Sequence, residues 1–128
     1  MSVKTFAALS AVWQFLAWGG RVSLLGEAGA TNWDWIRIGT GVGLGVVLAV
    51  VAIWREAPFD FQEKVASSYL LLTVVVWGRS VVAVWSEANT LGFRAIHTAL
   101  ALVTFFLAVA LVRAVKTARS ASSYGATA

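Results

Sequence analysis

Cysteine is absent from the 128-residue sequence, and proline, histidine and methionine each occur only once. The lack of cysteine excludes disulfides, thiolate metal sites and catalysis by a thiol. His97 has no second histidine or cysteine with which to hold zinc. A haem iron would need a second axial ligand, and Met1 lies at the wrong end of the chain to supply one. We therefore expect no metal and no other cofactor.

Charge is also scarce. Only 12% of the residues are Asp, Glu, Lys or Arg, whereas 59% are hydrophobic; an ordinary soluble domain carries about 25% charged residues. A soluble chain of this length could not cover its surface with so few polar side chains. The sequence therefore predicts that the lipid bilayer is its solvent. No basic face is free in solution, so we expect no nucleic-acid partner, although the formal net charge is +4.

The charges separate four apolar stretches, at about residues 5–25, 35–54, 65–85 and 93–112. A helix of about twenty residues spans the hydrocarbon core of about 30 Å, and helices satisfy their own backbone groups in lipid. The first stretch continues past Trp18 and Arg21 without a clear small-x-small cleavage site, which favours a retained helix over a signal peptide. The pattern predicts an all-α, polytopic membrane protein with four transmembrane helices.

The connections between these stretches suggest two antiparallel hairpins, because the outer loops near residues 26–32 and 87–92 are short. The longer connection, residues 54–64, holds the only proline, Pro58, and the pair Asp60 and Glu63 resembles a capping box at the start of the third helix. We expect a transmembrane domain over residues 1–116. Residues 117–128 are mostly Ser, Ala, Gly and Thr with scattered basic residues, which is typical of a flexible tail.

The distribution of Lys and Arg predicts the orientation of the helices. One side of the four stretches carries Lys4, Arg55, Lys64, Arg113, Lys116 and Arg119, and the other carries Arg21, Arg37 and Arg94. Because basic residues concentrate on the cytoplasmic side, both termini are expected in the cytoplasm, with the protein in the cytoplasmic (plasma) membrane.

The two halves of the sequence echo one another at offsets of 57 to 59 residues. The matched segments are Trp18-Gly19-Gly20-Arg21 with Trp77-Gly78-Arg79, residues 32–37 with residues 89–94, and Arg55 with Arg113. A tandem duplication of a helical hairpin would explain this echo. The alternative is chance similarity between apolar segments that all need arginine and tryptophan at their outer ends.

Arg79 lies about fourteen residues into the third stretch, roughly 10 Å below the outer edge of the membrane. Its guanidinium stays charged, so it requires an anion or water. The available anions are Glu27, Glu87, a lipid phosphate, a bound anion or a carboxylate of another subunit. The simpler alternative is that Arg79 extends toward the interface and contacts one of these glutamates.

Other polar residues gather in the same outer half of the membrane. We predict that they contact an anion, a lipid headgroup or a partner protein, and the candidates are Arg21, Arg79, Arg94, His97, Glu27 and Glu87. For His97 alone, a packing or interface role remains the alternative.

The second stretch contains glycine at every second position from Gly39 to Gly45. Two overlapping small-xxx-small pairs result, Gly39 with Gly43 and Gly41 with Gly45. Glycine lets two helices approach closely in lipid, so we predict helix packing here. The partner helix belongs either to this chain or to another. The spacing does not match a dinucleotide-binding loop.

Three segments resemble small four-helix integral membrane proteins of actinobacterial type. They are Trp-Gly-Gly-Arg-Val-Ser-Leu-Leu at 18–25, Val-Trp-Gly-Arg-Ser at 76–80 and Gly-Phe-Arg-Ala-Ile-His-Thr at 92–98. The resemblance implies a fold and a membrane location, and it carries no activity.

Three functions are compatible with these features. The short loops favour an accessory or scaffolding subunit of a larger membrane complex, for example a respiratory assembly, or a homo-oligomer. The small size, the glycines and the basic tail also fit a holin-like or pore-forming permeabiliser. The outer arginines fit a carrier or binder of an anion or lipid headgroup. We expect no enzyme activity, because no acid, nucleophile or metal pair shares a membrane depth.

Overall fold

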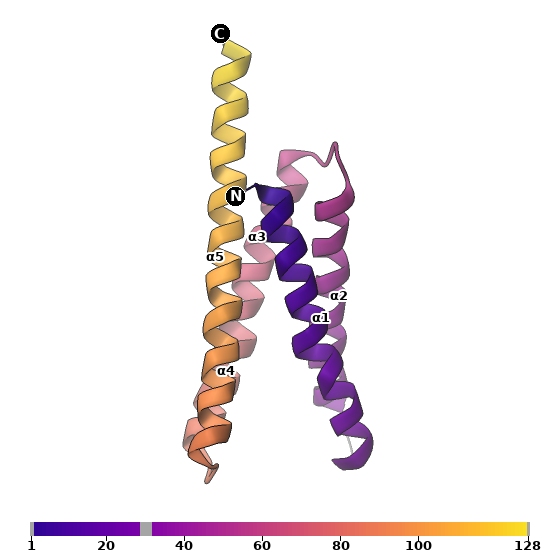
Figure 1. Ribbon diagram of the computed structural model, residues 1–128, viewed down its shortest axis with the longest axis vertical. Coiled ribbons are helices and arrows are strands. Elements are labelled where there is room, and N and C mark those ends of the chain that lie inside the picture. The colour runs from indigo at the N-terminus through magenta and orange to yellow at the C-terminus, as the bar shows by residue number, and fades with distance from the viewer. Residues whose placement is uncertain (1, 29–31, 128) are drawn as a thin grey trace. The chain divides into compact units, whose positions relative to one another are not determined.

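A computed structural model describes the backbone of residues 2–28 and 32–127 and the side chains of residues 2–21, 32 and 34–123. The regular elements of these residues are all helical, as the sequence predicts (Figure 1). In chain order they are α1 (Val3–Ala28), α2 (Asn32–Ile53), α3 (Phe59–Leu72), η1 (Thr73–Trp77), α4 (Gly78–Ser86) and α5 (Leu91–Thr127).

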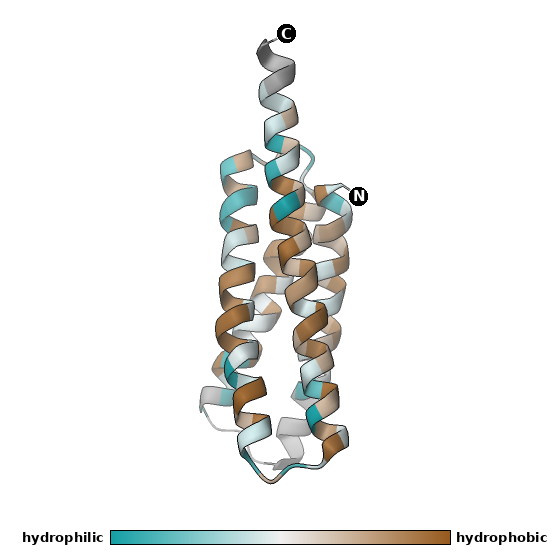
Figure 2. Cartoon of the chain, turned by 90° about the vertical axis from the view of Figure 1, so that its left-hand side faces the viewer, coloured by the Kyte–Doolittle hydropathy of each residue, from teal (hydrophilic) through white to brown (hydrophobic). Residues whose placement is uncertain are grey.

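Three helical segments of the described residues are long and apolar enough to cross a membrane. They are Asp34–Ile53, Phe59–Ser86 and Leu91–Ser123. Figure 2 shows hydrophobic residues along the central parts of the helices and more hydrophilic residues toward their ends. Helix α1 is not among the three, because Ser10, Gln14 and Arg21 lower its hydropathy. The structure thus indicates a membrane protein with three candidate spans.

The chain divides into two compact units, Met1–Pro58 and Phe59–Ala128. We call them unit 1 and unit 2 and describe each by itself. In unit 1, α1 packs along α2, and in unit 2, the segment from α3 to α4 packs along α5 (Figure 1). The division falls directly after the single proline, which cannot continue a preceding helix.

Two of the four glycines of α2 allow close packing against α1. A methyl group added to Gly41 would overlap the indole ring of Trp18, and one added to Gly45 would lie 3.3 Å from the Cβ of Gln14. At Gly39 and Gly43, by contrast, no described atom lies within 4 Å of such a methyl group. Within unit 1, Gly41 and Gly45 thus lie against α1, while Gly39 and Gly43 face open space.

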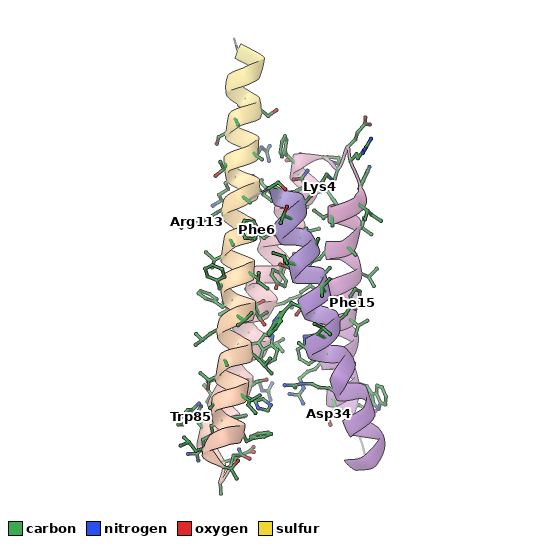
Figure 3. The ribbon with its side chains drawn as sticks, in the orientation of Figure 1. Lys4, Phe6, Phe15, Asp34, Trp85 and Arg113 are labelled. Atoms are coloured by element: carbon green, nitrogen blue, oxygen red, sulfur yellow. The ribbon has the colours of Figure 1, made fainter. Side chains whose placement is uncertain are left out.

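Lys4 joins α1 to α2 at the other end of unit 1, where α1 begins and α2 ends. Its ammonium group donates hydrogen bonds to the carbonyl oxygens of Trp54, at 2.6 Å, and Val51, at 3.3 Å. These carbonyls lie at the C-terminal end of α2, where backbone acceptors lack helical partners and the helix dipole favours a cation. Lys4 and Asp34 lie toward opposite ends of unit 1 (Figure 3), as expected for antiparallel helices.

In unit 2, the helix from Phe59 to Ser86 is continuous but changes its hydrogen-bond pattern at η1, a π-helix of five residues. The hydroxyl of buried Thr73 donates to the carbonyl oxygen of Tyr69 at 2.7 Å, so the side chain competes for a backbone acceptor where the pattern changes. Short π-helical turns of this kind occur frequently at functional sites. The sequence analysis did not predict η1.

Helix α5 is longer than its apolar stretch. The sequence analysis placed a flexible tail at residues 117–128, but α5 continues through this segment to Thr127. Residue 128 lies outside the described residues. Alanine and arginine are good helix formers, and neither proline nor glycine occurs from Phe93 to Tyr124. Arg119 also holds the extension to α3, with ion pairs to Asp60 at 3.0 Å and Glu63 at 2.8 Å.

The third helix likewise begins earlier than its apolar stretch, at Phe59 instead of residue 65. Its polar first turns contain Asp60 and Glu63, which the sequence suggested as a capping box. In the structure, Oε2 of Glu63 accepts a hydrogen bond from Nη1 of Arg119, and Asp60 forms an ion pair with the same guanidinium.

Four of the five buried residues in the described part of α1 recur in the segment α3–η1 at a spacing of 59 residues. The four pairs are Ala7 and Ala66, Ser10 and Tyr69, Gln14 and Thr73, and Trp18 and Trp77, and every member is at most 4% exposed. The echo seen in the sequence therefore has a counterpart in the pattern of burial.

Candidate functional site

The end of unit 1 at which α2 begins holds two arginines from different helices. Arg21 of α1 lies one turn beyond Trp18, and its guanidinium carbon is 4.9 Å from the centre of the Trp18 indole ring. Arg37 of α2 is close enough to exert electrostatic repulsion on Arg21. Because α1 and α2 are antiparallel and Trp18 packs on Gly41, the residues one turn further along both helices meet at this end. We call Arg21, Arg37, Asp34 and Trp18 the arginine cluster of unit 1.

Asp34 supplies a carboxylate to this cluster. Its Oδ1 atom accepts a hydrogen bond from Nη2 of Arg37 at 2.5 Å, across a three-residue spacing on one face of α2. The Nε atom of Arg37 is buried and has no hydrogen-bond partner among the described residues. Arg37 thus retains an N–H donor that Asp34 does not satisfy.

Unit 2 has its own arginine at the helix ends near residues 87–90. The Arg94 guanidinium donates to the carbonyl oxygen of Glu87 at 2.9 Å and lies 5.2 Å from the centre of the Trp85 ring. The indole N–H of Trp85 donates to the hydroxyl of Thr98 at 2.9 Å. Figure 3 shows Trp85 toward the end of unit 2 opposite Arg113. Arg94 therefore ties α4, the loop and α5 together.

His97 makes local contacts within α5. Its ring centre lies 4.1 Å from that of Phe93, and its Nδ1 atom is 3.0 Å from the Phe93 carbonyl oxygen. These contacts are those of a packing residue, which was the alternative considered for His97.

Arg79 is exposed on α4 directly after η1. It precedes the end of the helix at Ser86 by seven residues, or about 10 Å along the helix axis, and its depth in a membrane stays a prediction. The neighbouring Gly78 has no described atom within 4 Å of an added methyl group.

The six candidate residues do not all belong to one unit. Arg21 lies in unit 1, whereas Arg79, Arg94, His97 and Glu87 lie in unit 2. The side chain of Glu27 lies outside the described residues. Within unit 2, the structure brings the backbone of Glu87 to Arg94, and a single site shared by all six residues stays a prediction.

The sequence analysis missed two ionic contacts. The pair Asp34 and Arg37 has the i, i+3 spacing of a helical ion pair, so a search of local charge spacing would have found it. The pairing of Arg119 with Asp60 and Glu63 joins residues more than fifty positions apart, and no local signal points to it.

Guanidinium groups determine which ligands could bind at the end of unit 1 with Arg21 and Arg37 and at the end of unit 2 with Arg94. A planar guanidinium offers paired N–H donors to carboxylates and phosphates and does not deprotonate in proteins. The described residues contain no group of three or more His, Asp or Glu side chains that could hold a metal ion. The guanidinium groups suit contacts with anions.

No protein-family model, no curated protein and no solved structure matches this chain, so its function must be argued from the residues and contacts described above.

Proposed function

We propose that this protein is a four-helix integral membrane protein that acts as an accessory or scaffolding subunit by packing against other membrane subunits. In this proposal α1 is the fourth span, the helices form two hairpins, and both termini lie in the cytoplasm. The polar residues that lower the hydropathy of α1 include Ser10 and Gln14, both of which are buried and so need not face lipid.

The open glycine face of α2 carries the proposal. Gly39 and Gly43 have open space above them, and Val46 and Val50 continue the same face at helical spacing and are exposed. A small-xxx-small pair on an apolar span is a common contact between transmembrane helices, because it lets two backbones approach closely. Since Gly41 and Gly45 already contact α1, the other pair is available to a further helix.

The remaining apolar surface supports the same role. Between 17% and 28% of the residues in the most apolar windows of the three candidate spans are buried within the chain. The rest face lipid or partner helices, and neither requires a catalytic group. A respiratory complex is one example of an assembly that uses such small subunits.

The test is purification from native membranes in a mild detergent. We expect a fixed partner to remain bound to the wild-type protein, and the double variant Gly39→Leu/Gly43→Leu to lose that partner. Leucine at these positions would occupy the space that a closely packed helix needs, without meeting any described atom of this chain. A wild-type protein that purifies as a monomer would contradict the proposal.

Gly19→Leu is the matched control. Gly19 belongs to the same unit and also has no described atom within 4 Å of an added methyl group, but it lies on α1. This variant should retain the partner. Helical content by circular dichroism should be the same for all three proteins, which separates loss of binding from loss of folding.

The 59-residue spacing of buried residues supports the further proposal that the two hairpins are tandem copies. Each copy would place a buried tryptophan shortly before an arginine, with Arg21 three residues after Trp18 and Arg79 two residues after Trp77. Parallel copies related by an axis along the membrane normal occur in other membrane proteins.

A further inference from the structure

We propose that Ser10 and Gln14, on the buried face of α1, together bind a water molecule. The two side chains call for a ligand that is small and uncharged and that both donates and accepts hydrogen bonds. This inference goes beyond the accessory role and does not depend on it.

The first argument is that both side chains are buried and that each has an oxygen atom without a partner. Ser10 is 0% exposed and Gln14 is 2% exposed. The Oγ atom of Ser10 and the Oε1 atom of Gln14 have no hydrogen-bond partner among the described residues. A polar atom that leaves water on folding is costly to bury unless another partner replaces the solvent, and buried water molecules commonly supply that partner.

The second argument is the spacing of the two side chains. They are four residues apart on α1, so they lie on one face of the helix with Cβ atoms about 5–6 Å apart. Side chains of a helix lean toward its N-terminus, which directs the longer side chain of Gln14 toward Ser10. A water molecule with hydrogen bonds of about 2.8 Å bridges oxygen atoms up to about 5.6 Å apart. One molecule can therefore serve both side chains.

The third argument is that the surroundings favour a neutral ligand. No charged residue lies between Lys4 and Arg21, so this stretch of α1 offers no counter-charge to an ion. On the side of α2, the Cβ atom of Gln14 is 3.3 Å from a methyl group added at Gly45. Glycine contributes no polar side chain there, and backbone groups within a helix are already hydrogen-bonded to one another.

The fourth argument comes from the equivalent positions of unit 2, Tyr69 and Thr73. There the hydroxyl of Thr73 donates to the carbonyl oxygen of Tyr69 at 2.7 Å, so unit 2 satisfies this position with its own backbone. The Oε1 atom of Gln14 cannot use that solution, because an amide oxygen and a backbone carbonyl are both acceptors. It requires a donor, and a water molecule has two.

The first experiment is solid-state NMR of the full chain, labelled with ¹⁵N and embedded in lipid bilayers, with transfer of magnetisation from water protons. We expect a cross peak between water and the side-chain amide of Gln14, which Gln14→Met assigns by removing it. Ser10→Ala should weaken this cross peak at least about fivefold, because the water molecule loses one of its few partners. Ser67→Ala removes an exposed hydroxyl from α3 and should leave the cross peak unchanged.

The second experiment is a double-mutant cycle, in which the equilibrium constant for unfolding is measured by denaturant titration in micelles. Ser10→Ala alone should raise this constant about fivefold, because it deprives the buried Oε1 atom of Gln14 of its donor. In the Gln14→Met background the same change should have an effect below about twofold, because no acceptor is left to satisfy. Circular dichroism of each variant checks that the helices are intact.

Three results would overturn the proposal. One is a wild-type protein that lacks the water cross peak of Gln14; coupling in the cycle would then indicate a direct hydrogen bond between the two side chains. Another is a cross peak that Ser10→Ala leaves unchanged, which would mean that Gln14 contacts water without Ser10. The last is an equal effect of Ser10→Ala in both backgrounds, which would mean that the two side chains share no ligand.

Discussion

Gly39 and Gly41 are separated by a single residue on α2, yet a methyl group would find open space at one and the Trp18 ring at the other. The difference arises because two residues along a helix correspond to a rotation of about 200°. The three arginines likewise differ in their surroundings. Arg37 pairs with the carboxylate of Asp34, and Arg94 contacts a carbonyl oxygen and an indole ring, whereas Arg79 is exposed.

Gly41→Val should destabilise the protein, because the new side chain would overlap the Trp18 indole and force α1 away from α2. Overpacking of this kind costs about 1–3 kcal/mol. Gly39→Val should change the free energy of unfolding by less than about 0.5 kcal/mol. Both values can be measured by denaturant titration in micelles with circular dichroism. Equal stability of the two variants would contradict the packing of α1 on Gly41.

At the scale of the elements, polar contacts join the helices of each unit at the end where its first helix begins. In unit 1 it is the hydrogen bonding of Lys4 to carbonyls at the C-terminal end of α2, and in unit 2 it is the pairing of Arg119 with Asp60 and Glu63. The second contact lies beyond the apolar part of α5. A helix of 37 residues is about 55 Å long, so it exceeds a hydrocarbon core of about 30 Å by several turns.

Arg119→Ala should loosen the end of α5. Both ion pairs are partly exposed, so we expect a loss of only about 1 kcal/mol, equivalent to roughly fivefold faster amide exchange in residues 120–127. Hydrogen exchange followed by mass spectrometry measures this change. Arg113→Ala, at an exposed position of the same helix, is the control and should leave the exchange unchanged. Raised salt should reproduce the effect in the wild-type protein; unaltered protection under both conditions would mean that the extension is helical without these pairs.

At the scale of the whole molecule, the number of spans and the orientation follow from where charges and apolar stretches fall along the chain. Three candidate spans are present in the described structure, and α1 is the helix on which a fourth depends. With α1 in the membrane, both termini share one side, whereas an α1 that did not cross would place the N-terminus on the side of Asn32.

Labelling of introduced cysteines distinguishes these topologies, and the natural chain contributes no background because it has no cysteine. We expect a membrane-impermeant maleimide to label Asn32→Cys and Thr90→Cys in intact cells, and Ser2→Cys and Ser122→Cys only after lysis. Labelling of Ser2→Cys in intact cells would show that α1 does not cross, and labelling of Ser122→Cys would reverse the orientation of the C-terminus.

The sequence by itself determined the all-helical class, the approximate place of each helix and the glycine pairs, because these depend on hydropathy and on spacing within a few residues. It could not say that Gly41 and Gly45, but not Gly39 and Gly43, pack within the chain, since that depends on how α1 is rotated against α2. Local charge spacing would have been sufficient to find Asp34 beside Arg37, but only the packing of Trp18 on Gly41 brings Arg21 to the same end of unit 1. The π-helical turn and the anchoring of α5 by Arg119 likewise follow from tertiary structure, because packing and contacts between distant residues decide them.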